Sequence, residues 1–411
     1  MSDFGAELAR WMLARGLGVR ELHRRSGYSA GYITQLRQGH RTPSPEAARD
    51  LDDALGAGGA IAKCAPLRER GRGGLGAGPA QLSELSSGLR SPGHDPVTDR
   101  RAAGVIAAIG EALHAAPERD PGPERHPPEL EQDVLRAWQL RQSAEYARLG
   151  SLLTGLLRDI ACGEADAGMS VHVCNMTSSL LKRLGAFEMA AVAADRAFRA
   201  ASQAENPLLV SAAKLRVANV YLAASRHAEA VAVAAAAAED LPIRATSAPQ
   251  EAAAFGALLL TAAVAAAKLG EAAQAWEFLG HARAAAALCD REHASLYAVF
   301  GPVNLAVHGV QVATELGDGR EALRRAELTD PGRMPAALLE RRSTLLIDIA
   351  RAQHMQRDQT SAAETLIEAE RVAPLEVRYS GAARGLLAGL LGASRPSPAL
   401  RAMAVRLSAA A

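Results

Sequence analysis

The chain has 411 residues, of which 49% are hydrophobic and only 4% aromatic, and its formal net charge is +1. The length indicates two or three domains, and an alanine-rich composition with few β-formers favours packed helices over sheets. A net charge near zero excludes a polycation, so any affinity for nucleic acid must come from a local patch.

The cysteines, the N-terminus and one apolar run indicate where in the cell the protein is found. The four cysteines are far apart and form no CxxC pair, which favours a reducing compartment over a disulfide framework. Charges interrupt the apolar residues at the N-terminus, unlike in a secretory signal. The apolar run 252–267 is mostly alanine and shorter than the ~20 residues of a membrane span. We therefore expect a soluble, cytoplasmic protein that associates with the nucleoid and not with a membrane.

Residues 15–41 carry the clearest local pattern, which predicts a helix-turn-helix. Gly16 closes a first helix over about residues 4–15, and a short second helix follows over 19–25 with Leu22 directed inward. Gly27 lies in the turn after it.

The predicted third helix begins at Ser29, which acts as its N-cap, and presents Ile33 and Leu36 on one buried face. A fourth helix is expected over roughly 45–55. Seven arginines and one acid lie between residues 10 and 41, and the compensating acids come later, at Glu46, Asp50, Asp52 and Asp53. A local excess of six positive charges on a small surface is what neutralisation of DNA phosphates needs.

At these residues the chain resembles the Cro/repressor-type (XRE) helix-turn-helix domain. The resemblance covers residues 4–58 and rests on G-L-x-x-x-E-L, then S-G-Y-S-x-x-Y-I-T-x-L-x-x-G-x-R-x-P-S-P-E, then A-L-G. It implies that the third helix enters the major groove of double-stranded DNA. The DNA-binding residues that it implies are Ser29, Ala30, Gly31, Tyr32, Thr34, Gln35, Arg37, His40 and Arg41, with Arg24 and Arg25 on the preceding helix.

Within that set the roles differ. Ala30, Gly31 and Gln35 would face bases, and the Gln35 amide is suited to bidentate contact with adenine. Ser29 and Tyr32 would lie at the DNA backbone. Phosphate contacts, which position the protein without reading sequence, fall to Arg37, His40 and Arg41.

Breaker-rich segments follow this head. Gly, Pro and Ser dominate residues 66–98, and a second Pro-rich stretch precedes residue 130. Between them a short helix is expected over 100–115. The predicted organisation is a helix-turn-helix domain at 1–62, a flexible linker at 63–129, a helical-repeat domain at 130–395 and a C-terminal tail at 396–411.

The repeat domain is predicted from five turns that share one layout, a helix, a short polar turn and a second helix. Their central residues are spaced by 40, 45, 47 and 40, and they are Gly185, Ser225, Gly270, Gly317 and Arg357. In the motif Leu-Gly-(Asp/Glu)-x-x-x-Ala, glycine ends one helix in the left-handed conformation and the acid begins the next. Stacked hairpins of this kind build a solenoid with a concave face.

The C-terminal half resembles the tetratricopeptide-like half of actinobacterial XRE regulators, through LRAWQLRQSAEYARLGSLLTGLLRDI and through residues 300–378. The resemblance implies an all-α protein, a helix-turn-helix bundle followed by a tetratricopeptide-like solenoid. Some regulators with this layout bind a short peptide on the concave face. The expected ligand or partner face comprises Asn175, Asn219, Tyr221, Asn304 and His308. The alternative is that Asn219 and Asn304 cap or bridge helices internally.

No P-loop or HExxH motif occurs and no GxGxxG motif follows a predicted strand, and the histidines lack ligand spacing, so we expect no enzyme, cofactor or metal. Arg341, Arg342, Asp348 and Arg351 are expected to form pairs within the protein and not an anion site. The function predicted is a homodimeric, sequence-specific transcriptional regulator whose repeat half senses a peptide or small molecule or mediates oligomerisation. Two alternatives stay open, a protein-interaction scaffold with a weak DNA-binding head and a plasmid or chromosome maintenance protein. Gly18-Val19, where the family often has a polar pair, motivates the scaffold.

Overall fold

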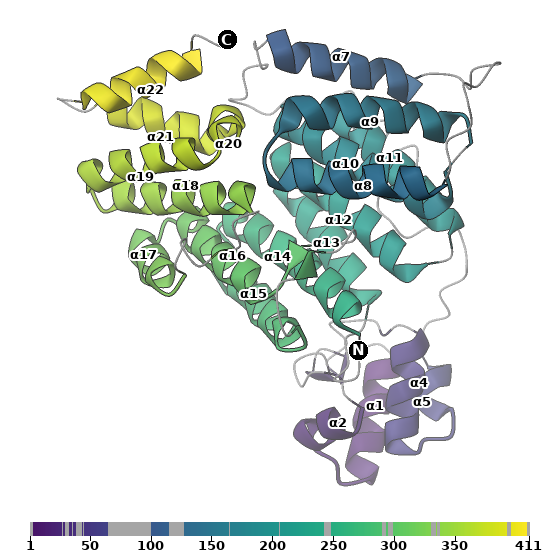
Figure 1. Ribbon diagram of the computed structural model, residues 1–411. Coiled ribbons are helices and arrows are strands. Elements are labelled where there is room, and N and C mark those ends of the chain that lie inside the picture. Colours follow the sequence, from purple (N-terminus) through teal and green to yellow (C-terminus); the bar gives the residue numbers. More distant parts are fainter. Residues whose placement is uncertain are drawn as a thin grey trace.

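A computed structural model describes residues 3–26, 28, 33–34, 36–37, 43, 45–64, 100–114, 127–163, 165–204, 206–241, 248–289, 293–294, 299–329, 334, 338–392 and 396–408. The described residues are almost entirely helical, as predicted (Figure 1). One element departs from the all-α expectation. It is a two-residue antiparallel ladder between β1 (His293–Ala294) and β2 (Val299–Phe300).

The N-terminal unit contains α1 (Asp3–Ala14), α2 (Val19–Ser26), α4 (Pro45–Leu55) and α5 (Ala60–Lys63). Gly16 ends α1 with φ +62°, as the sequence predicts, and the Leu17 amide donates to the Met12 carbonyl at 2.9 Å. Leu22, Ile33 and Leu36 are fully buried in one core with residues of α1 and α4. These three positions therefore serve packing, as the sequence indicates.

The short helix α5 was not predicted, and Asp52 explains how it is held. Asp52 is only 2% exposed, and its carboxylate accepts hydrogen bonds from the amides of Gly59, Ile61 and Ala62 at 2.6, 2.7 and 3.0 Å. These are the orphan donors at the start of a helix, where a negative charge is also favourable. Asp52 is thus a buried structural group and not one of the compensating surface acids, as the sequence had suggested.

Within the described residues, six helical hairpins follow one another (Figure 1). They are α8 (Pro127–Gln142) with α9 (Tyr146–Ala161), α10 (Ala167–Arg183) with α11 (Phe187–Gln203), α12 (Pro207–Ala223) with α13 (His227–Glu239), α14 (Pro249–Leu269) with α15 (Ala272–Ala286), α16 (Pro302–Glu315) with α17 (Gly319–Glu327), and α18 (Leu339–Met355) with α19 (Gln359–Val372).

All five predicted turn residues have left-handed backbone, with φ between 61° and 82°. A sixth, Ala144 with φ 58°, joins α8 to α9 and was missed because neither glycine nor the Leu-Gly motif marks it. Each turn repeats one hydrogen bond, from the amide after the left-handed residue to the carbonyl five positions earlier. Examples are Glu271 to Ala266 at 3.0 Å and Asp318 to Ala313 at 2.9 Å. The repeat is therefore a recurring helix-ending geometry, for which glycine is favoured but not required.

Alanine sets the close packing of the hairpins. On α11, Ala190, Ala194, Ala197 and Ala201 lie three or four residues apart and are buried, which makes a smooth stripe against α10. On α14, Gly256 leaves room for the Phe300 ring, which an added Cβ would meet at 2.1 Å. By length and composition α14 could span a membrane, but 83% of its apolar window is buried in the protein, as in a core helix.

The segments around the hairpins are also packed. The short helix expected over 100–115 is α7 (Arg100–His114), and its Ile109 and Leu113 are fully buried in the core that holds α9 and α10. After α19 come α20 (Pro374–Tyr379), α21 (Gly381–Leu391) and α22 (Pro398–Ser408). Although 396–411 was expected to be a tail, α22 buries Leu400 and Met403 against α18, α19 and α21.

Candidate nucleic-acid interface and ligand cavity

Helix α2 carries three exposed arginines, Arg20, Arg24 and Arg25. Glu21 pairs with Arg24 at 2.5 Å and with Arg25 at 3.4 Å. Ion pairs of this exposed kind are weak and exchange readily for a phosphate partner. The surface of α2 thus retains an excess of two positive charges among these four residues.

Two other arginines of the head serve its structure. The Arg15 guanidinium donates to the Gly56 carbonyl at 2.9 Å, which ties the end of α1 to the end of α4. Arg10 pairs with Glu7, and the Trp11 ring lies 5.9 Å from the Arg10 guanidinium and 5.5 Å from that of Arg15. The sequence counts six excess positive charges, but Arg10 and Arg15 make contacts within the domain. Fewer than six charges are therefore free to face DNA.

The turn after α2 is fixed by polar contacts. The His23 Nδ1 lies 2.8 Å from the Tyr28 carbonyl, and the Tyr28 hydroxyl donates to Asp50 at 2.7 Å. Tyr28 is also buried in the apolar core. Tyr28 is thereby linked to both α2 and α4.

Of the predicted DNA-binding residues, only some are described. Arg24 and Arg25 lie exposed on α2, and Thr34 and Arg37 are partly buried and helical. The others fall outside the described residues, namely Ser29, Ala30, Gly31, Tyr32, Gln35, His40 and Arg41.

The concave side of the hairpin stack holds a cavity of about 230 Å³. Its wall comes from the first helix of every hairpin, α8, α10, α12, α14, α16 and α18, together with β2 and Leu338. On α10 the lining residues His172, Asn175, Ser179 and Lys182 follow helical spacing, so one face of the helix points inward.

Four of the five residues expected on the ligand face line this cavity, namely Asn175, Asn219, Asn304 and His308. Tyr221 does not. It follows Asn219 by two positions, which places it on the far side of α12, where it is buried with the Arg226 guanidinium 4.9 Å from its ring.

Both amides also make internal contacts, Asn219 within its own helix and Asn304 with β2. Asn219 Nδ2 donates to the Leu215 carbonyl and Asn304 Nδ2 to the Val299 carbonyl, both at 2.8 Å. The His308 Nδ1 lies 2.9 Å from the Asn304 carbonyl. Burial, aided by the charge of Arg341, lowers the pKa of His308 to about 4. His308 is therefore neutral at pH 7, with Nδ1–H donating and Nε2 left as an acceptor.

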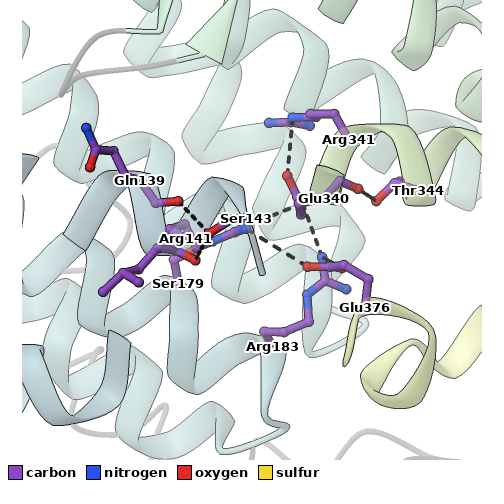
Figure 2. Close-up of polar contacts among 10 residues, drawn as sticks. Gln139, Arg141, Ser143, Ser179, Arg183, Glu340, Arg341, Thr344 and Glu376 are labelled. Atoms are coloured by element: carbon purple, nitrogen blue, oxygen red, sulfur yellow. Dashed lines mark hydrogen bonds and ion pairs between the residues drawn. The ribbon is translucent and has the colours of Figure 1, made fainter. Parts of the chain in front are cut away.

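A buried cluster of ion pairs lies at the cavity wall (Figure 2). Arg141 of α8 and Arg183 of α10 face Glu340 of α18 and Glu376 of α20. The nitrogen–oxygen separations are 3.3 Å for Arg141–Glu340, 3.4 Å for Arg183–Glu340, 2.9 Å for Arg183–Glu376 and 4.0 Å for Arg141–Glu376. We call these four residues the closure cluster, because they join the first two hairpins to the last.

The two acids of the closure cluster have pKa values shifted in opposite directions. Burial opposes ionisation of Glu340, but Arg141, Arg341 and Arg183 outweigh it and hold the pKa of Glu340 far below its usual range. Burial raises the pKa of Glu376, which is 1% exposed, to about 7, with Arg141 opposing the rise. None of this cluster was predicted, since its arginines and its acids lie far apart in the sequence, with Glu340 199 residues after Arg141.

A second network binds neighbouring hairpins. Arg351 contacts Glu315 and Asp348, both at 2.9 Å, and Lys268 contacts Glu315 at 2.9 Å. Asp348 and Arg351 thus pair within the protein, as expected. Among the residues with described positions, no group of three or more His, Cys, Asp or Glu side chains is arranged to hold a metal ion.

Comparison with known proteins assigns the N-terminal unit to a known kind of domain. Residues 3–62 match the family model described as a helix-turn-helix domain. The N-terminal unit is a helix-turn-helix domain. No curated protein matches the chain. Among solved structures, one match is the crystal structure of Bacillus thuringiensis PlcR in complex with the peptide PapR7 and DNA. It shares 15% identity, over 71% of this chain and 100% of that one, with a TM-score of 0.30, and nothing about the ligand of this protein follows from it.

Proposed function

We propose that this protein is a sequence-specific, DNA-binding transcriptional regulator of the XRE type, cytoplasmic and without enzymatic activity, whose helical-repeat body senses a signal. The observation that carries the proposal is the helix-turn-helix domain at residues 3–62. The exposed Arg20, Arg24 and Arg25 of α2 support it, because they leave positive charge beside the predicted recognition helix.

The sensing role is supported by the cavity. Asn175, Asn219, Asn304 and His308 come from three different hairpins and converge on one concave wall. Polar groups that converge on one cavity are typical of a ligand site.

We expect the regulator to bind as a homodimer, with two heads on half-sites about one helical turn, ~34 Å, apart. The test is selection of genomic DNA fragments by purified full-length protein at near-physiological salt. An inverted-repeat motif upstream of genes supports the proposal. Random fragments, or binding that disappears with a modest increase in salt, contradict it and favour the scaffold.

Two substitutions sharpen this test. Gln35→Ala should relax the recovered motif at one position of each half-site, since a base contact is lost. Arg41→Ala should weaken binding to all sequences and reduce the salt slope by about one, since a phosphate contact is lost. The control is Arg148→Gln, at an exposed arginine on α9 that pairs with Glu145. If footprint and salt slope match wild type in both variants, the placement of the recognition helix is wrong.

A further inference from the structure

The cavity wall is strongly basic. Five cationic side chains line it, against a single lining carboxylate, Glu340; the five are Arg141, Lys182, Arg183, Arg216 and Arg341. Glu376 contacts Arg141 and Arg183 from behind the wall. The positive groups therefore outnumber the negative ones even when the whole closure cluster is counted.

Only some of the five cations form ion pairs within the described part of the chain. Arg141 and Arg183 belong to the closure cluster, and Arg341 contacts Glu340 at 3.5 Å. Lys182 on α10 and Arg216 on α12 make no ion pair with any residue that the structure describes. The Arg216 Nε is buried and has no hydrogen-bond acceptor among those residues.

Keeping these cations together is costly for the folded protein. Burial, reinforced by the charges of Arg141 and Arg341, lowers the pKa of Arg216 to about 10. Burial and the charges of Arg183, Arg216 and Arg141 lower the pKa of Lys182 well below its ordinary value. Both side chains are only partly exposed, and a charge withdrawn from water without a partner is normally avoided, so an anion between them would relieve the arrangement.

Neutral groups beside them are also available for a ligand. Asn175 is 6% exposed, and its Oδ1 has no hydrogen-bond donor among the described residues. The Trp138 Nε1 is a buried donor in the same wall, likewise without an acceptor there. Buried polar groups are rarely left unpaired, and here they gather around the two unpaired cations.

We propose that the concave cavity binds a small anionic molecule, with Lys182 and Arg216 contacting its phosphate or carboxylate group and Asn175 and Trp138 contacting its neutral part. The size agrees with a small molecule. A cavity of about 230 Å³ suits a metabolite and not a folded partner. The binding itself is independent of the DNA-binding head; that it regulates transcription rests on the proposed function.

The test uses the purified full-length protein in 150 mM NaCl, at which nonspecific surface attraction is screened over about 8 Å. Titration calorimetry and thermal unfolding are measured with inorganic phosphate, AMP and citrate, and with adenosine as the uncharged partner of AMP. We expect saturable binding and a higher Tm for at least one anion and none for adenosine. Response to phosphate or AMP but not citrate identifies a phosphate ligand, and the reverse a carboxylate one.

Arg216→Met and Lys182→Met are the decisive variants. Each should weaken the anion affinity about tenfold to a hundredfold, as expected for loss of one charged hydrogen bond. Without anion, each should unfold at or above the wild-type Tm, because no ion pair is lost and a repulsion is removed. The control is Arg199→Gln, at an exposed arginine on α11 that pairs with Asp195, and its response should equal wild type.

Three results would overturn the proposal: no saturable anion binding by the wild type, equal affinity in wild type and Arg216→Met, or a fall in the Tm of both methionine variants without anion, which would make these cations structural. DNA binding is measured separately on the same preparations. Anion binding without specific DNA binding sinks the proposed regulator but leaves the site. Specific DNA binding without anion binding does the opposite.

Discussion

Exposed residues with left-handed backbone end two helices of the repeat body where glycine would be expected. Ser225 and Arg357 have φ 61° and 64°, and both side chains are exposed. This conformation costs a residue with a Cβ about 1–2 kcal/mol in steric strain. For glycine the cost lies mainly in the entropy that the unfolded chain loses on folding. The fold therefore tolerates local strain at two of its turns.

Ser225→Gly and Arg357→Gly should each stabilise the protein by about 0.5–1 kcal/mol, because the strain is removed at an exposed side chain. Urea denaturation of the full chain measures this. Ser151→Gly is the matched control, an exposed serine within α9, where the same change should destabilise by about 0.5–1 kcal/mol. A decrease in stability for both turn variants would mean that these side chains make contacts worth more than the strain.

His308 should make stability depend on pH. Its folded pKa of about 4 lies below its ordinary value of 6.5, so between these values the unfolded chain binds a proton that the folded protein does not. The contribution of His308 to the free energy of unfolding should thus be fully present above pH 6.5. It should fall by about 3 kcal/mol as the pH drops to 4. Arg341 and Glu340 are the charged groups that act on it.

The measurement compares wild type with His308→Gln by urea denaturation at several pH values from 4 to 7.5. Taking the difference removes contributions common to both proteins, such as that of Glu376, whose raised pKa acts in the opposite direction. The difference should change with pH between 4 and 6.5 and be constant above it. A difference that is flat over the whole range contradicts a buried, neutral His308.

At the level of helices, the sequence predicted those features that depend on residues close together in the chain. Gly16 and the five turn residues end helices through contacts within six positions, so the pattern sufficed to place them. Asn175, Asn219, Asn304 and His308 reached one wall because each lies on the first helix of a hairpin, and those helices share the concave side. The DNA-contacting residues of the third helix remain a prediction.

What the sequence did not reveal depends on separate elements. Asp52 looks like its exposed neighbour Asp53 along the chain, and only the approach of α5 distinguishes them. The cations of the cavity come from α8, α10, α12 and α18, and no single helix shows an anion site. A signal was nevertheless available: Arg216 and Asn219 share a helix face, as do Asn175 and Lys182, so basic and amide residues recur together on first helices.

The cap on α5 gives a direct test. Asp52→Ala should destabilise the helix-turn-helix domain by about 2–3 kcal/mol, because three amides lose their acceptor. Asp52→Asn should lose less, since its side-chain oxygen still accepts. Asp53→Ala, at the exposed neighbour on the same helix, should change stability by less than about 0.5 kcal/mol. Hydrogen exchange of the Gly59, Ile61 and Ala62 amides reports the loss locally, and unchanged protection in Asp52→Ala would refute the cap.

Across the whole molecule, the closure cluster turns a row of hairpins into a closed body. Tyr146 of α9 and Tyr379, the last residue of α20, strengthen the same junction, with ring centroids 6.4 Å apart. Arg141, Arg183 and Glu340 also line the cavity, so an anion bound by Lys182 and Arg216 would share its wall with the closure cluster. We therefore expect anion binding and the closure to be energetically coupled.

A double-mutant cycle measures that closure. Arg183→Met or Glu376→Leu alone should each cost about 3–5 kcal/mol, since each leaves a buried charge without its nearest partner. The double variant should cost less than the sum by at least about 1 kcal/mol. The control cycle uses the exposed pair Arg148–Glu145, with coupling below about 1 kcal/mol. Additive effects at Arg183 and Glu376 would show that the closure cluster does not hold the ends together.

The closure also imposes an order of events on synthesis. Arg141 leaves the ribosome 199 residues before Glu340, which at about 5–20 residues per second is roughly 10–40 s. During that interval the head and the early hairpins exist without their closing acids, and the nascent chain carries basic side chains on an open concave face. A message cut short before α18 would therefore yield a polypeptide with a complete head but no closed cavity, and such a fragment would hold DNA-binding capacity that no ligand of the cavity could control.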